Sequence, residues 1–297
     1  MRWPFLILLG LSLVVSAQVQ GQHLKAAAGE NKKFKDCAQC PEMVVVPAGS
    51  FMMGSPQDEA KRANEHEDQV RVSITQPFAV GVFAVTRGEF AAFASATKHK
   101  PDGGCYVRIG TEWKELQDRS WRSPGFAQDD RHPVTCVNWH DAKAYVSWLT
   151  SKTGKTYRLL SEAEREYITR AGANTPFWIG SSVSPDQANY KGNETYALGK
   201  KGKWRQKTVR VDSFRPNPWG LYNVHGNVWD WTEDCWNDKN NGNPSDGSAR
   251  TTGDCDNRIV RGGAWAYGPD HLRAAFRYWN QPHNRNSGQS FRVARTL

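Results

Sequence analysis

The sequence predicts one α+β domain, residues 41–297, that contains little regular secondary structure. Glycine and proline are frequent, at 26 and 15 of 297 residues, which indicates many turns. Three stretches show helical spacing, and two of them begin with residues that can cap a helix. The strand patterns between them are short, and no linker or repeat of fixed period divides the domain.

Two of the predicted helices begin with a capping box. Thr86 and Glu89 have the spacing in which each side chain bonds to the backbone of the other at a helix start. Ser161 and Glu164 have the same spacing, and their helix is predicted to end at Ala171-Gly172. Both starts are local signals, so they predict helices independently of the rest of the fold.

The third helix is predicted to begin at Trp139 and to end before Gly154, because apolar side chains recur there at helical spacing. Residues 99–135 are predicted to be irregular, and the chain after residue 172 to contain only short strands and loops. Strands are predicted at 43–46, 70–74, 78–85 and 158–160.

The N-terminus has the features of a secretory signal peptide, residues 1–17. Arg2 supplies the positive end, and Phe5 to Val15 form an apolar run that is short for a membrane span. Cleavage is predicted after Ala17, and an uncleaved anchor is the alternative. Residues 18–40 are interpreted as a polar tether. The mature protein is therefore expected in the periplasm or outside the cell, without a transmembrane segment.

Six cysteines in an exported chain imply up to three disulfides. About fifteen connectivities are possible for six cysteines. Local spacing favours three pairs that each bracket a turn-rich segment: Cys37–Cys40, Cys105–Cys136 and Cys235–Cys255. The spacing of the first pair also occurs in redox motifs. No strand and helix flank it in the thioredoxin manner, which favours a structural loop.

The chain is basic, with a formal charge of +9 at pH 7. Such a surface favours anionic partners, among them acidic glycans and lipid headgroups. The densest basic run, residues 200–207, is interpreted as a solvated loop. Because the basic residues do not form a patch interleaved with aromatic residues, nucleic-acid binding is not expected. An anionic glycan, a peptide or an envelope protein is the expected partner.

Several short motifs follow one another in a characteristic order along residues 41–297. They are Phe51-Met52-Met53-Gly54, Tyr157-Arg158-Leu159-Leu160-Ser161-Glu162-Ala163-Glu164, Asn217-Pro218-Trp219-Gly220-Leu221-Tyr222-Asn223, Gly226-Asn227-Val228-Trp229-Asp230-Trp231 and Arg261-Gly262-Gly263-Ala264-Trp265. On these motifs the chain resembles the formylglycine-generating enzymes, or sulfatase-modifying factors. The resemblance implies their fold, which is related to that of C-type lectins.

The chain departs from this family at the catalytic positions. Members that oxidise a sulfatase cysteine carry two thiols after a Gly-Gly-Ser element, and these bind copper and react as thiolates. The aligned residues here are Tyr267 and Leu272, and the serine is Ala264. Neither side chain can replace a thiolate as copper ligand or nucleophile, so bound copper and formylglycine synthesis are not expected. Arg165 is a further departure, because the family usually has Trp there.

The resemblance also implies a structural calcium ion. The matching loop would supply side-chain oxygens from Asn223 and Asp230 and backbone carbonyls from Gly226 and Val228. A tight turn in which the same side chains cap backbone amides is the alternative. A second family site would use the neighbouring residues Asn189-Tyr190, but its acidic partner falls in a basic segment of this chain.

Two classes of function fit these observations. One is a maturation factor in the periplasm that works by oxidative or other chemistry without a thiol, as implied by a resemblance to exported relatives that mature pyoverdine. The other is a non-catalytic module with a lectin-like fold that binds a glycan or peptide or serves as an envelope scaffold. No acid–base pair or nucleophile motif decides between them, so no catalytic residue is assigned.

Overall fold

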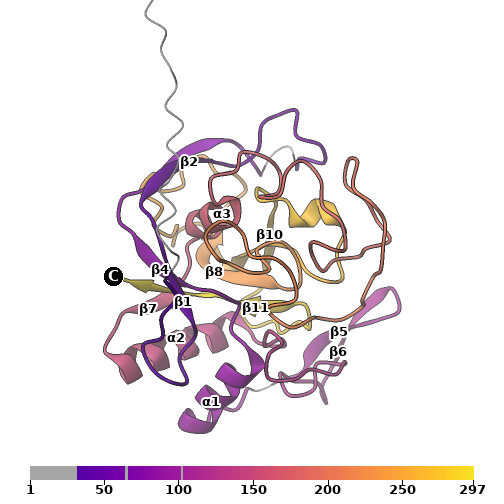
Figure 1. Cartoon of the computed structure of the whole chain (residues 1–297). Coiled ribbons are helices and arrows are strands. Elements are labelled where there is room, and N and C mark those ends of the chain that lie inside the picture. The colour runs from indigo at the N-terminus through magenta and orange to yellow at the C-terminus, as the bar shows by residue number, and fades with distance from the viewer. Residues whose placement is uncertain (1–31, 64–65, 102) are drawn as a thin grey trace, which may run out of the picture. The chain divides into compact units, whose positions relative to one another are not determined.

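The computed structural model describes residues 32–63, 66–101 and 103–297 (Figure 1). Within this part of the chain there are three α-helices: α1 (Arg87–Thr97), α2 (Trp139–Thr153) and α3 (Glu162–Arg170). Each begins with a complete capping box, in which the side chain of Thr86, Asn138 or Ser161 accepts a hydrogen bond from a backbone N–H three residues later. The helix starts predicted from Thr86 and Ser161 are confirmed.

One antiparallel sheet brings the end of the chain into its centre. Its strands, in spatial order, are β1 (Met43–Val46), β4 (Phe78–Gly81), β12 (Val293–Thr296) and β7 (Tyr157–Leu159). Val80 pairs with Val44 on one side and with Ala294 on the other, and all three are fully buried. The C-terminal strand β12 therefore lies between β4 and β7 and joins β7 to the sheet.

A second sheet carries most of the positions discussed below. Its strands, in spatial order, are β10 (Arg277–Asn280), β9 (Asp254–Arg261), β8 (Trp229–Trp236) and β11 (Gln289–Phe291). The pair β8 and β11 is parallel and the other pairs are antiparallel. Strands β8 and β9 are eight residues long each, so the prediction of only short strands after residue 172 was wrong.

Two hairpins complete the strands: β2 (Gly49–Met53) with β3 (Val70–Ile74), and β5 (Cys105–Ile109) with β6 (Glu112–Leu116). The second hairpin lies in residues 99–135, which were predicted to be irregular. Its turn uses Gly110 at a φ of +61°. A short 3-10 helix, η1 (Pro269–Leu272), precedes β10.

The domain begins earlier than residue 41. Phe34 forms a β-bridge with Met43, and Oδ2 of Asp36 accepts a hydrogen bond of 2.6 Å from the hydroxyl of Tyr157. The Arg295 guanidinium lies 3.3 Å from the same carboxylate. Residues 32–40 are thus part of the fold, and the predicted tether 18–40 is wrong for them. The predicted signal peptide 1–17 lies outside the described residues.

All six cysteines form disulfides: Cys37–Cys40, Cys105–Cys136 and Cys235–Cys255. The pairing predicted from local spacing is confirmed. Disulfides persist in oxidising compartments, which agrees with a location outside the cytosol. In the described residues, no helix has the length and apolar character needed to cross a bilayer.

The largest core cluster is rich in aromatic rings. Phe90 and Phe93 of α1 contact Tyr145 of α2, and Tyr145 also contacts Phe291 of β11, with ring centroids 5.3–6.1 Å apart. All four rings are at most 1% exposed. The cluster packs α1 and α2 together, which Figure 1 shows as neighbouring helices, and it anchors β11 beside β8.

Candidate functional site

The two positions aligned with the family thiols differ in their access to solvent. Leu272 is fully buried at the end of η1, in a cluster with Phe177 and Tyr190. A Cβ atom at Gly263 would lie 2.6 Å from Cδ1 of Leu272, so the glycine permits this close packing. Tyr267 is only partly buried. Of the two positions, only Tyr267 can contact a ligand.

Tyr267 lies in a group of rings that we call the Tyr267 cluster: Trp113, Trp229, Tyr267, His271, Phe276 and Tyr278. The ring centroid of Tyr267 is 5.3 Å from those of both Trp229 and His271. Trp229 in turn stacks on Tyr278 at 5.6 Å. Strands β6, β8 and β10 and helix η1 all contribute to this cluster, and β8 and β10 are held relative to each other because both pair with β9.

The cluster places a protonated phenol near the pair formed by His271 and the Asp270 carboxylate. Burial raises the pKa of Tyr267 to about 12, so its phenol keeps its proton at neutral pH. Nδ1 of His271 lies 3.1 Å from Oδ1 of Asp270, and this histidine lowers the pKa of the Asp270 carboxyl. The phenol can donate or accept a hydrogen bond, and the histidine beside a carboxylate can move a proton.

An exposed aromatic surface continues from the cluster along β10. Tyr278 and Trp279 are 42% and 40% exposed, and their rings are 6.4 Å apart and nearly parallel. Trp279 also borders a cavity of about 450 Å³ whose other walls include Trp236, Asp238 and Asp254. Exposed rings beside carboxylates offer both stacking surface and hydrogen-bond acceptors to a ligand.

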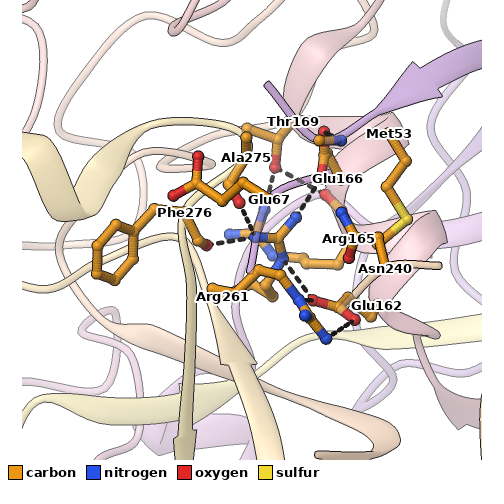
Figure 2. Close-up of polar contacts among 12 residues, drawn as sticks. Met53, Glu67, Glu162, Arg165, Glu166, Thr169, Asn240, Arg261, Ala275 and Phe276 are labelled. Carbon is orange, nitrogen blue, oxygen red and sulfur yellow. Dashed lines mark hydrogen bonds and ion pairs between the residues drawn. The ribbon is translucent and has the colours of Figure 1, made fainter. Parts of the chain in front are cut away.

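Buried ion pairs hold β9 and β10 against α3. The Arg261 guanidinium pairs with Glu166 and donates to the backbone carbonyls of Ala275, at 2.8 Å, and Phe276 (Figure 2). Arg277 at the start of β10 makes two hydrogen bonds to Glu162, of 2.6 and 3.0 Å. These contacts orient the segment that carries Phe276 and Tyr278, because both arginines and both glutamates are buried.

Another buried arginine ties the loop before β3 to the end of η1. Arg273 donates to Glu59 at 2.7 Å and to both oxygens of Glu67 at 2.6 and 2.7 Å. Glu67 is fully buried although its sequence neighbours are charged. This loop is therefore fixed to the same segment that carries His271.

The loop expected to bind calcium has two unpaired oxygens. Oδ1 of Asn223 and Oδ1 of Asp230 are buried and accept no hydrogen bond from the described residues. Gly226 has a φ of +81°, and a Cβ atom there would lie 2.6 Å from the carbonyl oxygen of Asn189. Buried oxygens without donors cost free energy, and a cation would satisfy them. The donor atoms present thus fit a calcium ion.

Two guanidinium groups occupy the other side of Asp230. Nε of Arg165 donates to Oδ2 of Asp230 at 2.9 Å, and Nε of Arg292 lies 3.7 Å from the same oxygen. Burial lowers the pKa of Arg292 to about 10, and it also lowers the pKa of Arg165. A cation in this loop would share one carboxylate with two arginines, which weakens its binding.

Comparison with known proteins identifies the family. Residues 28–297 match the family described as the sulfatase-modifying factor enzyme 1-like domain. The chain belongs to this family. The formylglycine-generating enzyme of Thermomonospora curvata is 34% identical over 230 residues, which cover 65% of this chain and 71% of the relative.

Two further relatives of this sulfatase-modifying-factor chain bear on its function. The bovine inactive C-alpha-formylglycine-generating enzyme 2 is 28% identical, with 86% of this chain and 88% of the relative covered. The solved structure of PvdO from Pseudomonas aeruginosa is 40% identical with a TM-score of 0.79. That comparison covers 90% of this chain and 98% of PvdO. The relationship to C-type lectins stays a prediction.

The second family loop contacts the first. Asn189 forms a parallel β-bridge with Gly226, and its carbonyl accepts a hydrogen bond of 2.8 Å from the N–H of Asn227. Oδ1 of Asn189 is buried without a donor among the described residues, whereas the Tyr190 hydroxyl donates to the carbonyl of Val183 at 3.2 Å. Among the described residues, no group of three or more His, Cys, Asp or Glu is placed to hold a metal ion.

Most of the Tyr267 cluster was not predicted from the sequence. The family resemblance pointed to Tyr267 and Leu272, and the structure gives only Tyr267 an accessible position. Trp229, His271 and Tyr278 join it from three separate elements. The available signal was the density of aromatic residues between 265 and 279, which by itself does not say which rings meet.

Proposed function

We propose that this sulfatase-modifying-factor protein is an exported maturation factor that acts on a peptide substrate without thiol chemistry. The observation that carries the proposal is the pair of aligned positions, where Tyr267 and Leu272 stand in place of thiols. All six cysteines are in disulfides, which supports the same conclusion. The likeness to PvdO over nearly its whole length supports a role in maturation.

Formylglycine synthesis requires a thiolate both as the soft ligand of copper and as the group that engages the substrate cysteine. A phenol with a pKa of about 12 and a buried leucine supply neither. We therefore propose that the protein is not a formylglycine generator and holds no copper. In its place, Tyr267 and His271 would contact the substrate, the phenol through a hydrogen bond and the imidazole as a proton carrier.

The proposal that the protein does not generate formylglycine is tested with a peptide that carries a sulfatase cysteine. The protein is incubated with the peptide, with and without copper, and the masses of the products are measured by mass spectrometry. We expect no aldehyde under either condition. The formylglycine-generating enzyme of Thermomonospora curvata serves as the positive control. Aldehyde formed over more than one turnover would show that another group replaces the thiols and would overturn the proposal.

We further propose that the protein is exported by a cleaved signal peptide and holds one structural calcium ion. Export is supported by the predicted signal peptide 1–17 and by the disulfides. The mature N-terminus would be Gln18, and N-terminal sequencing of the exported protein checks this. The ion would be held by the side chains of Asn223 and Asp230 and the carbonyls of Gly226 and Val228. Asn189 and Tyr190 remain predicted ligands of a second ion.

A second candidate function is favoured by the exposed rings of β10. Trp279 borders a cavity with carboxylate walls and Tyr278 is exposed beside it, an arrangement that suits binding of a glycan or peptide without turnover. A Tyr278→Ala/Trp279→Ala variant distinguishes the two functions. If the protein is a binding module, this variant loses ligand binding while Tyr267→Phe keeps it. If the protein is a maturation factor, Tyr267→Phe lowers turnover.

A further inference from the structure

One turn exposes a large apolar side chain almost completely. Leu198 is 95% exposed, whereas the other exposed large hydrophobic residues of the described chain are between 40% and 56% exposed. A single exposed leucine is common on protein surfaces. What distinguishes Leu198 is that hydrogen bonds and close packing hold the base of the turn, with this side chain at its tip.

The base of the turn is packed on both sides. The N–H of Gly199 donates to the carbonyl of Tyr196 at 2.9 Å, which closes the turn. Tyr196 is 3% exposed, and its hydroxyl donates to the carbonyl of Ala60 at 2.6 Å. A Cβ atom at Gly199 would lie 2.5 Å from the carbonyl oxygen of Val183. The backbone therefore cannot retract, and Leu198 stays in solvent.

Three lysines follow the tip within five residues. Lys200, Lys201 and Lys203 are all exposed, and within the described residues none of them forms an ion pair. The N–H of Gly202 donates to the carbonyl of Gly192 at 2.7 Å, which returns the chain to the body of the protein. The loop thus combines one exposed apolar side chain, Leu198, with three lysines that form no ion pair among the described residues.

We propose that this loop, residues 197–203, docks the protein on an anionic lipid surface. Leu198 would enter the boundary between headgroups and acyl chains, and the lysines would contact the lipid phosphates. The net charge of +9 adds a long-range attraction to the same surface. The inference does not depend on the proposed maturation activity, because it uses no side chain of the Tyr267 cluster.

The alternatives fit the loop less well. A glycan or a nucleic-acid backbone would attract the lysines but offers no apolar layer for Leu198. Stacking of bases would need an accessible ring, and the nearest candidate is Trp204. Its Nε1 donates to the carbonyl of Trp265 at 2.9 Å, and the charged ends of Arg108 and Lys191 lie 5.5 and 5.8 Å from its ring centre. Trp204 is therefore engaged within the protein.

The test is co-sedimentation of the mature protein with vesicles of phosphatidylglycerol and phosphatidylcholine, compared with phosphatidylcholine alone. We expect binding only to the anionic vesicles, with a loss of binding at high salt. Leu198→Ser should weaken binding roughly tenfold. Replacing Lys200, Lys201 and Lys203 with glutamine should weaken it roughly fivefold for each lysine.

The matched control replaces an exposed leucine and lysine elsewhere, as Leu297→Ser with Lys155→Gln, and should bind like the wild type. All variants change solvent-exposed side chains, so their melting temperatures should not differ. Equal binding by the wild type and Leu198→Ser, or no binding to anionic vesicles, would overturn the proposal. Binding to heparin or single-stranded DNA without vesicle binding would also overturn it and would identify a polyanion site.

Discussion

Nε of Arg277 lies 2.6 Å from Oε1 of Glu162, and this buried ion pair joins the strand that carries Tyr278 to the first turn of α3. The same guanidinium donates to the carbonyls of His66, at 3.0 Å, and Asn237, at 2.9 Å. One side chain thus connects four segments that are distant in sequence. The exposed rings of β10 owe their position to this buried contact.

Breaking this pair should destabilise the protein strongly. Arg277→Met removes both short hydrogen bonds of the buried Glu162 carboxylate and leaves it only the Arg261 guanidinium, 3.5 Å away, which should cost about 3 kcal/mol in the free energy of unfolding. Arg87→Ala is the matched control, because its pair with Asp130 is largely solvent-exposed and should contribute at most about 1 kcal/mol. Urea denaturation measures both. Similar small losses for the two variants would contradict a structural role for Arg277.

His225 should make stability fall as the solution becomes acidic. Burial lowers its pKa to about 3, and its Nε2 accepts a hydrogen bond of 3.1 Å from the N–H of Trp178. In the unfolded chain the pKa is about 6.5, so below that pH the unfolded state binds more protons. The contribution is complete above about pH 6.5 and is lost toward pH 3, by about 1.4 kcal/mol for each pH unit.

Denaturation at several pH values checks this dependence. His225→Gln should flatten the decline between about pH 6.5 and pH 4 relative to the wild type. The control His140→Gln replaces an exposed histidine and should leave the decline unchanged. Parallel curves for His225→Gln and the wild type would mean that His225 is not kept neutral by the fold.

The three disulfides should contribute unequally. The bond Cys105–Cys136 spans 31 residues, and its loss through Cys105→Ala/Cys136→Ala should cost about 4 kcal/mol because the unfolded chain gains freedom. The bond Cys37–Cys40 spans three residues, and its loss should cost about 1.5 kcal/mol. Denaturant titration compares the two double variants, and mass spectrometry of the unreduced protein should find no free thiol.

Calcium should stabilise the folded protein through Asn223 and Asp230. If calcium binds only the folded state, a concentration of about 100 times the dissociation constant adds about 2.7 kcal/mol. Chelation should then lower the melting temperature by several degrees, and restored calcium should reverse the loss. Asp230→Asn should melt earlier than the wild type, since Arg165 and Arg292 lose their partner, and should no longer respond to calcium.

The response of the melting temperature to calcium reports on ion binding, whereas the melting temperature without calcium reports on the ion pairs of Asp230. The control Asp246→Asn removes an exposed carboxylate elsewhere and should keep the response to calcium. A wild-type midpoint unchanged by chelation, with no calcium found by elemental analysis, would leave Asn223 and Asp230 as turn residues.

The helix starts and the disulfide pairs could be predicted because their signals are local. Thr86 with Glu89, and Ser161 with Glu164, are three residues apart, so a capping box can be recognised without knowing the fold. The cysteine pairs likewise bracket short segments of chain. These features can therefore be located in the sequence without knowledge of any long-range contact.

The long strand β8 could not be predicted in the same way. It contains Asp230, Thr232 and Asp234, which are buried and have partners in distant segments, so its alternation of apolar and polar residues does not mark a solvent face. Glu67 is a similar case, since it is fully buried although charged residues surround it in the sequence. Its burial follows from Arg273, which is 206 residues away in sequence.

Thiol-independent maturation is measured most directly by expressing the protein in a Pseudomonas aeruginosa strain that lacks PvdO and quantifying the pyoverdine produced. We expect the wild type to restore pyoverdine, Tyr267→Ala to lower the yield severalfold, and Leu198→Ser to leave the maturation step intact. Immunoblots of the periplasmic fraction confirm equal export of each variant. A folded, exported wild-type protein that restores no pyoverdine, or a Tyr267→Ala variant as active as the wild type, would contradict this function and its site.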